Sequence, residues 1–258
     1  MTLVLPPRLT ASAEALRDAA RRRGLRTVRL PTFDVPAGLA ATHLHAGPSF
    51  ADAVAPRLGI APLEAPADWL TRLPKEYTRR DIRVMPIQEA YRLRRPAFIK
   101  SPNDKGIPAL VYTDGSRLPG PDAVDPQTPV LVSDVVEFTT EHRLYLFGGV
   151  VHTGSRYAQR GRLDPGPLPA DAAAFGAALL AACGDTLPTA IVVDVGEVDG
   201  HWAVIEANAA WASGMYHADP QHVLDVVLAA AGPATSVTER NRPFLRHPGG
   251  TGGVEPER

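Results

Sequence analysis

The feature that most limits the fold of this chain is a pair of apolar segments near its C-terminal end, each interrupted by oxygen-bearing side chains. The segments "TAIVVDVGEV" and "HWAVIEAN" flank Asp199–Gly200, a pair typical of a two-residue hairpin turn. Residues two apart in a strand point to the same side, so Glu206 and Asn208 share one face of the expected sheet. Asp194 lies twelve residues before Glu206 across the turn, which allows the two carboxylates to be cross-strand neighbours.

The chemistry of these three side chains indicates a metal site. Two carboxylates and an amide oxygen on one face form the hard-oxygen set that Mg²⁺ prefers. Leaving Asp194 and Glu206 together without a cation would cost on the order of several kcal/mol through repulsion and desolvation. The alternative is that all three face solvent on a half-exposed sheet, as most charged residues do. Because they interrupt adjacent apolar strands, we favour the metal site.

Composition excludes several classes of protein. The chain has 258 residues, 45% of them hydrophobic, and a net charge of -1, which suits one large or two small domains and argues against a nucleic-acid-coating protein. The single cysteine, Cys183, excludes a disulfide or a cysteine metal site within the chain. The spacings of His43, His45, His217 and His222 do not match a zinc-binding helix, so we expect surface or turn histidines. No signal-peptide pattern or membrane-length apolar run is present, and we expect a cytoplasmic protein.

The N-terminal part has the pattern of an α/β lobe. "TLVLP", "TASAEALRDAARRRG" and "TVRLP" predict strand, helix and strand, which favours a parallel sheet. Thr10 or Ser12 can cap the helix, and Gly24 can end it. We expect this lobe to span residues 1–95; it contains neither a GxGxxG nor a GxxxxGK[ST] phosphate-binding loop.

From Pro96 the pattern changes to antiparallel strands. We expect strands at "AFIK" and "PVLVSDVVEF". We also expect a hairpin in "PALVYTDGSRL" that turns at Asp114–Gly115, and two strands in "EHRLYLFGGVVHTGSRY" that are joined at Gly148–Gly149. "DAAAFGAALLAAC" and "PQHVLDVVLAAAG" predict helices. The tail from Pro233 is rich in Pro, Gly and Arg, and we expect residues 233–258 to be mostly disordered.

Charged residues at the strand ends indicate anion binding. Lys100 and Lys105 together could clamp phosphate oxygens, although each alone could be an exposed strand end. Glu141 and Arg143 have the same parity and share a face, which could also be an exposed salt bridge. Arg156 lies on the adjoining strand. Two arginines converging on one sheet face would suit a substrate that carries phosphate or carboxylate groups.

Four segments of the chain, by their sequence and order, resemble the ATP-grasp superfamily. They are "AFIKSPNDKG", "VVEF", "EHRLYLFGGVVHTGSRY" and "VVDVGEVDGHWAVIEAN". The resemblance covers about 96–230 and is strongest to a compact subgroup, and the preceding lobe is similar to a pre-ATP-grasp domain. It implies an α/β (α+β) fold in which two α+β subdomains close over ATP. We therefore expect a small subdomain at 96–136 and a large one at 137–232. The loop "SPNDKGIPAL" is shorter than the usual lid over the phosphates.

The resemblance also implies nucleotide contacts. Lys100 and Lys105 would lie against the ATP phosphates, in an order left open. The stretch 134–138 would form the interdomain hinge, with its backbone reading the adenine edge and Glu137 near the adenine or ribose. The residues expected to bind the nucleotide are Lys100, Lys105, Val135, Val136, Glu137, Phe138, Glu141 and Arg143.

For catalysis, the resemblance implies that Arg143 and Arg156 touch the γ-phosphate or the substrate carboxylate, together with Lys100. Asp194, Glu206 and Asn208 would hold one or two Mg²⁺ ions, with Mn²⁺ as an alternative. Glu206 would bridge the two ions.

The expected function is an ATP- and Mg²⁺-dependent carboxylate–amine ligase that forms an amide or peptide bond through an acylphosphate. Its partners would be a small-molecule carboxylate and an amine or peptide, without nucleic acid or membrane; a homodimer is left open. Ser213 and Gly214 would contact the substrate, while Trp211 and Tyr216 are either a substrate wall or core. Two alternatives are a kinase or phosphotransferase on the same scaffold and a non-catalytic nucleotide-binding module.

Overall fold

The computed structural model describes residues 1–103 and 106–247, and its contacts divide the chain into two compact units. Residues 1–65 pack with residues 138–247 as unit 1, and residues 66–137 form unit 2. The lobe expected at 1–95 is therefore split between the units. Residues 60–62 pair with 231–233 in unit 1, whereas 82–86 pair with 129–133 in unit 2. In the described residues, no helix is long and apolar enough to cross a membrane.

Unit 1 begins with the predicted parallel sheet, in the order β2-β1-β3. Helix α1 (Ala11–Arg22) begins at Thr10, whose hydroxyl accepts a hydrogen bond from the Ala13 amide and so caps the helix. The Ser12 hydroxyl is used elsewhere, as acceptor for the Met215 amide at 3.0 Å. The remaining elements of this part are β1 (Thr2–Leu5), β2 (Arg26–Arg29), β3 (His43–Leu44), α2 (Pro48–Leu58) and β4 (Ile60–Pro62), and β4 pairs with β14 (Ala231–Pro233).

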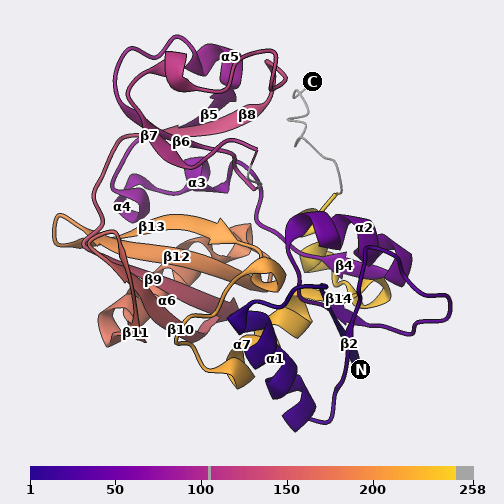
Figure 1. Ribbon diagram of the computed structural model, residues 1–258. Helices are drawn as coiled ribbons and strands as arrows, with labels where there is room; N and C mark the ends of the chain where they lie inside the picture. The colour runs from indigo at the N-terminus through magenta and orange to yellow at the C-terminus, as the bar shows by residue number, and fades with distance from the viewer. Residues whose placement is uncertain (104–105, 248–258) are drawn as a thin grey trace. The chain divides into compact units, whose positions relative to one another are not determined.

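The larger sheet of unit 1 is antiparallel, in the order β11-β10-β9-β12-β13 (Figure 1). The hairpins predicted at Gly148–Gly149 and Asp199–Gly200 both form, and all four turn residues have positive φ. Helix α6 packs against the face of Leu144, while α7 packs on the opposite face with Tyr145 and Val192. The bounds are β9 (Thr140–Phe147), β10 (Val150–Gln159), β11 (Arg162–Pro167), α6 (Ala170–Cys183), η2 (Gly184–Thr186), β12 (Ala190–Val198), β13 (His201–Asn208), η3 (Ala210–Ala212) and α7 (Pro220–Ala230).

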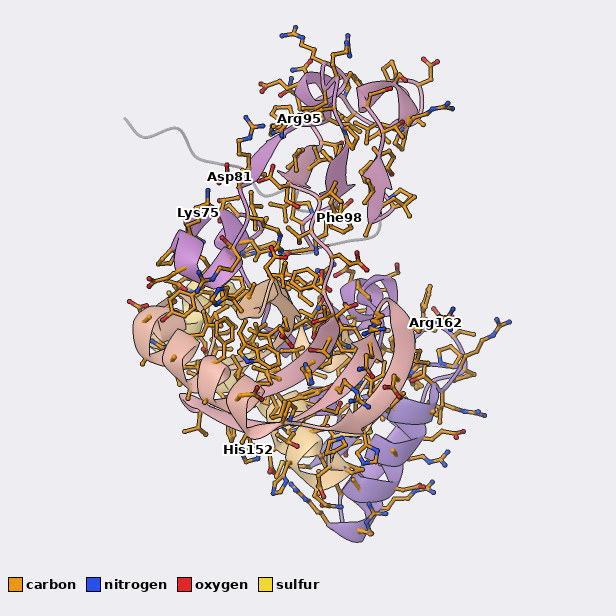
Figure 2. The ribbon with its side chains drawn as sticks, turned by 90° about the vertical axis from the view of Figure 1, so that its left-hand side faces the viewer. Lys75, Asp81, Arg95, Phe98, His152 and Arg162 are labelled. Atoms are coloured by element: carbon orange, nitrogen blue, oxygen red, sulfur yellow. The ribbon has the colours of Figure 1, made fainter. Side chains whose placement is uncertain are left out.

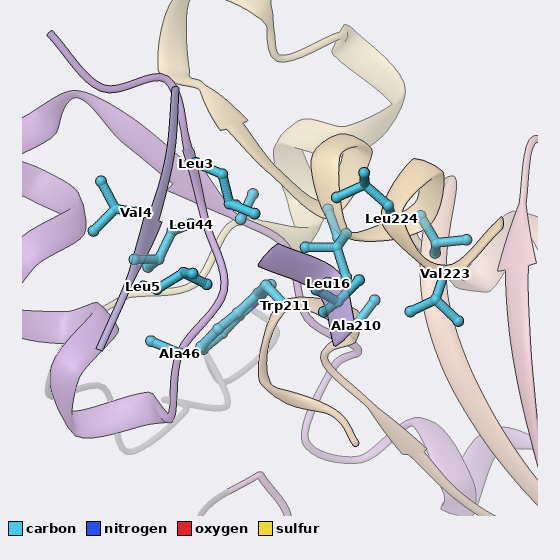
Figure 3. Packing of buried hydrophobic residues seen from close by; sticks show 14 of the residues in the cluster. Leu3, Val4, Leu5, Leu16, Leu44, Ala46, Ala210, Trp211, Val223 and Leu224 are labelled. Carbon is cyan, nitrogen blue, oxygen red and sulfur yellow. The ribbon is translucent and has the colours of Figure 1, made fainter. Parts of the chain in front are cut away.

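One continuous core joins the N-terminal part of unit 1 to its larger sheet. Leu3, Leu16 and Leu44 pack in the same cluster as Trp211 and Leu224 (Figure 3), and all five are fully buried. This shared core explains why residues 1–65 fold with residues 138–247, since each part buries apolar side chains against the other.

The C-terminal segment corrects one expectation. Residues 233–247, predicted to be disordered, are structured: η4 (Ala234–Ser236) and η5 (Glu239–Phe244) follow β14. The Arg246 guanidinium binds the carboxylates of Asp52 (2.7 and 3.0 Å) and Glu64 (2.6 Å). A composition rich in Pro, Gly and Arg indicates disorder only when such tertiary partners are lacking. Residues 248–258 lie outside the described chain.

Unit 2 is a four-stranded antiparallel sheet in the order β5-β8-β6-β7. The hairpin predicted at Asp114–Gly115 is wrong, because β7 pairs with β6 and the chain after it turns into η1. The Asp114 carboxylate caps this turn by accepting from the Ser116 amide. The elements are α3 (Trp69–Arg72), α4 (Lys75–Thr78), β5 (Ile82–Pro86), α5 (Ile87–Ala90), β6 (Ala97–Lys100), β7 (Leu110–Tyr112), η1 (Gly115–Arg117) and β8 (Pro129–Ser133).

A buried histidine gives unit 1 a predictable acid sensitivity. The His142 ring packs edge-on against Trp202 at 5.2 Å, and burial, then the charge of Arg156, lower the pKa of His142 from 6.5 to about 4. The unfolded chain therefore takes up the proton first, so this contribution to stability is complete above pH 6.5 and is lost as the pH falls towards 4. We expect His142→Gln to flatten the pH dependence of the urea midpoint in this window. His201→Gln, at an exposed position, is the control; equal slopes in wild type and His142→Gln would contradict the assignment.

Candidate functional site

The three predicted oxygen-bearing residues meet on one face of the larger sheet. Asp194 on β12 is directly opposite Glu206 on β13, and the register shifts just beyond this pair because β13 has one extra residue there, Ile205. The Asn208 amide nitrogen donates to Glu206 Oε1 at 2.8 Å and to Asp194 Oδ2 at 3.1 Å. The amide thus lies between the two carboxylates and offsets their repulsion. Asp194 is only 1% exposed, whereas Glu206 and Asn208 are half-buried.

These side chains fit a divalent cation by the chemistry of their donors. Two carboxylates and one amide are hard-oxygen ligands, and their polar ends already converge within hydrogen-bond distance. In the described chain, no group of three or more His, Cys, Asp or Glu residues could hold a metal ion. The sequence predicts the amide oxygen of Asn208 as the third ligand; because the amide nitrogen donates to both carboxylates here, the amide would have to turn to present that oxygen.

Arg143, expected to reach a phosphate or a carboxylate of the substrate, lies against Asp194 instead. Its Nε donates to Asp194 Oδ1 at 2.8 Å and its Nη2 to Oδ2 at 2.7 Å. Nη1 donates to the Gly214 carbonyl at 3.1 Å. Burial lowers the pKa of Arg143, but the Asp194 carboxylate outweighs this and the pKa lies above its usual value. This cation is therefore held inside the protein.

The two arginines do not converge, which corrects the sequence-based expectation. On β10, Ser155 is opposite Arg143 and Arg156 is opposite His142, so Arg156 points to the other face of the sheet. There its Nε donates to the Asp164 carbonyl at 3.0 Å, and its Nη2 pairs with the Asp164 carboxylate at 2.8 Å. The sheet face to which Arg156 points could not be predicted without knowing the register between β9 and β10.

Glu141 shares the face of Arg143, as its spacing predicts. Its Oε2 accepts a hydrogen bond from the Tyr157 hydroxyl at 2.8 Å. Burial is the largest cause that raises the pKa of Glu141, and the nearby charges of Asp194 and Glu206 raise it further against the opposing Tyr157 hydrogen bond. The Glu141 carboxylate therefore belongs to the same electrostatic cluster.

Two tyrosines also belong to this face: Tyr157, which was not predicted from the sequence, and Tyr216, for which the sequence left a substrate wall or core open. The Tyr157 and Tyr216 rings stack at 5.1 Å with an interplanar angle of 19°. The guanidinium carbon of Arg143 lies 5.7 Å from the Tyr157 centroid and 5.3 Å from that of Tyr216. Tyr216 has a φ of 51°, uncommon for a bulky residue, and is 42% exposed. The equal parity of Glu141, Arg143 and Tyr145 was the available signal for an extended polar face.

The segment 209–216 after Asn208 is held against this face by many polar contacts. The Gly214 carbonyl accepts from Arg143 and from the Tyr145 hydroxyl, and the Met215 carbonyl accepts from Ser155 Oγ. Ser213 Oγ donates to the Ala209 carbonyl, and the Ser213 amide donates to the Ala210 carbonyl. The Ser213 hydroxyl and amide are thus engaged within the protein, whereas the expected substrate contact of Gly214 through its backbone donor stays a prediction.

In unit 2, Lys100 ends β6 on the face opposite its buried neighbour Ile99. Phe98 shares the face of Lys100 and is labelled in Figure 2. Lys105 lies outside the described residues. Residues 134–138 follow β8 without regular structure and span the boundary between the two units. In the described chain, the backbone groups of 135–137 form no hydrogen bond.

Unit 2 also contains a pocket of about 480 Å³ that the sequence analysis did not predict. Four cationic side chains and two carboxylates line it, among them Lys75, Asp81 and Arg95, which lie along one side of the unit (Figure 2). Lys75 pairs with Asp81 at 2.6 Å, and the Asp81 amide donates to Asp134. The other lining residues include Leu70, Arg80, Ile82, Arg83, Leu93 and Ser133. The pocket reaches Asp134, where the irregular segment begins.

Comparison with known proteins shows which family and which folds the chain is similar to. A family model described as an ATP-grasp domain matches residues 77–226, and a search of curated proteins finds no significant match. Among solved structures, the chain is similar to a RimK domain protein ATP-grasp from Sphaerobacter thermophilus, with TM-score 0.51 and 14% identity over 88% of this chain and 99% of that one. It is also similar to D-alanine–D-alanine ligase from Bacillus anthracis, with TM-score 0.52 and 12% identity over 89% and 96%. A third is the macrocyclase MdnC bound with precursor peptide MdnA from Microcystis aeruginosa, with TM-score 0.48 and 11% identity over 88% and 99%.

Proposed function

The chain belongs to the ATP-grasp superfamily, and from this premise we propose that it is an ATP- and Mg²⁺-dependent carboxylate–amine ligase. The fold predicted from the sequence is confirmed by the family match and the structural neighbours. The observation that carries the proposal is the convergence of Asp194, Glu206 and Asn208 on one sheet face of a chain of this family.

The nucleotide side of the proposal rests on unit 2. The free backbone groups of 135–137 suit the hydrogen-bonding edge of adenine, and the pocket that begins at Asp134 has the size of a small-molecule site. Lys100, together with Lys105, would lie against the phosphates, and Lys75, Arg80 and Arg95 add positive charge to the pocket. Val136, Glu137 and Phe138 would complete the adenine and ribose contacts.

In the proposed reaction, the substrate carboxylate attacks the γ-phosphorus and ADP leaves, which gives an acylphosphate. The amine then attacks the acyl carbon, phosphate leaves, and the amine gives up a proton. Asp194, Glu206 and Asn208 would hold Mg²⁺, which neutralises phosphate charge when bound. The anchored segment 209–216 would form the wall that keeps water from the acylphosphate, with the exposed side of Tyr216 towards the substrate.

An isotope experiment tests this function. Purified protein is incubated with ATP, Mg²⁺ and pooled carboxylates labelled with ¹⁸O, with and without pooled amines and short peptides. We expect ADP release that needs both pools, an amide product by mass spectrometry, and transfer of one ¹⁸O from the carboxylate to phosphate. A phosphorylated product without an amide would instead identify a phosphotransferase. Absence of ATP binding by the wild type would reject any nucleotide-dependent function.

A further inference from the structure

The contact between Arg143 and Asp194 is the most buried ion pair of the candidate site. Two parallel hydrogen bonds of 2.8 and 2.7 Å join the guanidinium to the carboxylate, with 11% of the Arg143 side chain and 2% of the Asp194 side chain exposed. Such a bidentate pair fixes the plane of the carboxylate as well as balancing its charge. Lysine could supply the positive charge but not the bidentate geometry.

Arg143 is itself held from three further sides. The Gly214 carbonyl accepts from Nη1 at 3.1 Å, and the rings of Tyr157 and Tyr216 lie within 5.7 Å of the guanidinium carbon. To reach a phosphate, the guanidinium would have to leave both tyrosines and abandon a carboxylate that is 1% exposed. A buried carboxylate without its counter-charge is strongly unfavourable.

The orientation of the Asp194 carboxylate is fixed by three hydrogen bonds. Arg143 donates one to each oxygen, and the Asn208 amide donates a second to Oδ2. The two donors of one rigid guanidinium fix the plane of this carboxylate and so limit the direction in which it can face a cation. The Arg143 guanidinium therefore presents Asp194 to a metal in one orientation, beside Asn208, the neighbouring expected ligand.

We infer that Arg143 is a positioning residue that acts through Asp194, fixing this carboxylate for a divalent cation, rather than a ligand of the phosphates or of the substrate carboxylate. The inference rests on the proposed metal site. It assigns the Tyr157–Tyr216 pair a supporting role, because the stacked rings keep the guanidinium against Asp194.

Mn²⁺ binding to the full chain without nucleotide tests the inference. The free ion is measured by electron paramagnetic resonance. We expect Arg143→Met and Arg143→Lys each to weaken Mn²⁺ binding by about 10–100-fold, the range for loss of a residue that orients a metal ligand. Arg23→Met is the matched control, since Arg23 pairs with Asp225 and Gln221 in the same unit and its side chain bonds to none of the candidate site residues; its Mn²⁺ affinity should not change. In an Asp194→Asn background, adding Arg143→Met should have no further effect.

Unchanged or tighter Mn²⁺ binding in both Arg143 variants, with weaker ATP binding, would overturn the inference and make Arg143 a phosphate ligand. An additive loss in the Asp194→Asn background would also overturn it. If Arg143→Met does not fold, the Mn²⁺ affinity of Arg143→Lys decides, because this variant keeps the charge and loses only the bidentate geometry.

Equal Mn²⁺ affinity in wild type and Glu206→Gln would reject the metal site itself. A lower Mn²⁺ affinity in Glu206→Gln but in neither Arg143 variant would reject only the role of Arg143.

Discussion

Replacing Glu206 with glutamine should lower Mg²⁺-dependent ADP formation roughly a thousandfold, or about 4 kcal/mol of transition-state stabilisation. Glutamine has the same shape and keeps an oxygen for the Asn208 amide, which now donates to Glu206 Oε1. It removes the negative charge that would hold the cation beside the phosphates. Steady-state ADP release, measured over a range of Mg²⁺ concentrations, gives the effect on both the maximal rate and the Mg²⁺ dependence.

The same substitution should stabilise the metal-free protein slightly. Asp194 and Glu206 are direct cross-strand neighbours, and like charges in such pairs are destabilising. A lower activity with an equal or higher thermal midpoint would separate loss of function from loss of fold. Glu197→Gln removes a carboxylate from the same hairpin at a position of opposite parity to Asp194 and should keep near-wild-type activity. Similar activity in the Glu206 and Glu197 variants would refute the role of Glu206.

Local sequence rules were sufficient where the relevant contacts are local. The Asp199–Gly200 turn and the two-residue period of a strand predicted that Asp194, Glu206 and Asn208 share a face, and the structure places them together. The same rules limited the α1 cap to Thr10 or Ser12, of which Thr10 is the cap, and located the turn at Gly148–Gly149. In each case the determining interactions span only a few residues.

Contacts between distant segments could not be predicted in this way. Arg143 meets Asp194 because β9 pairs with β12, two strands that are not consecutive in the chain. Arg156 faces away because the β9–β10 register sets it opposite His142. The composition of the C-terminal tail predicted disorder, although Arg246 in that tail binds two carboxylates from distant segments. Register and tertiary pairing decide these positions, and neither can be read from one strand alone.

Trp211 shows how such distant contacts connect the fold to the site. Its indole is fully buried in the core of unit 1, and Nε1 donates to the Leu63 carbonyl at 2.7 Å. The Trp211 carbonyl accepts from the Ala46 amide, and the Arg246 guanidinium lies 5.6 Å from the ring. Trp211 follows Asn208 by three residues, so the N-terminal part and the tail both fix the segment that leaves the candidate metal ligands.

We therefore expect Trp211→Ala to lower the free energy of unfolding of unit 1 by about 3–5 kcal/mol, the usual cost of truncating a buried aromatic residue. Trp211→Phe keeps most of the apolar contact but leaves the Leu63 carbonyl without its donor, which should cost about 1–3 kcal/mol. Urea denaturation followed by far-UV circular dichroism measures both losses. Trp202→Ala is the control, because Trp202 is only half-buried and should lose less. A loss in Trp211→Ala no larger than in Trp202→Ala would show that the segment after Asn208 is held by its backbone contacts with Arg143, Tyr145 and Ser155 rather than by the shared core.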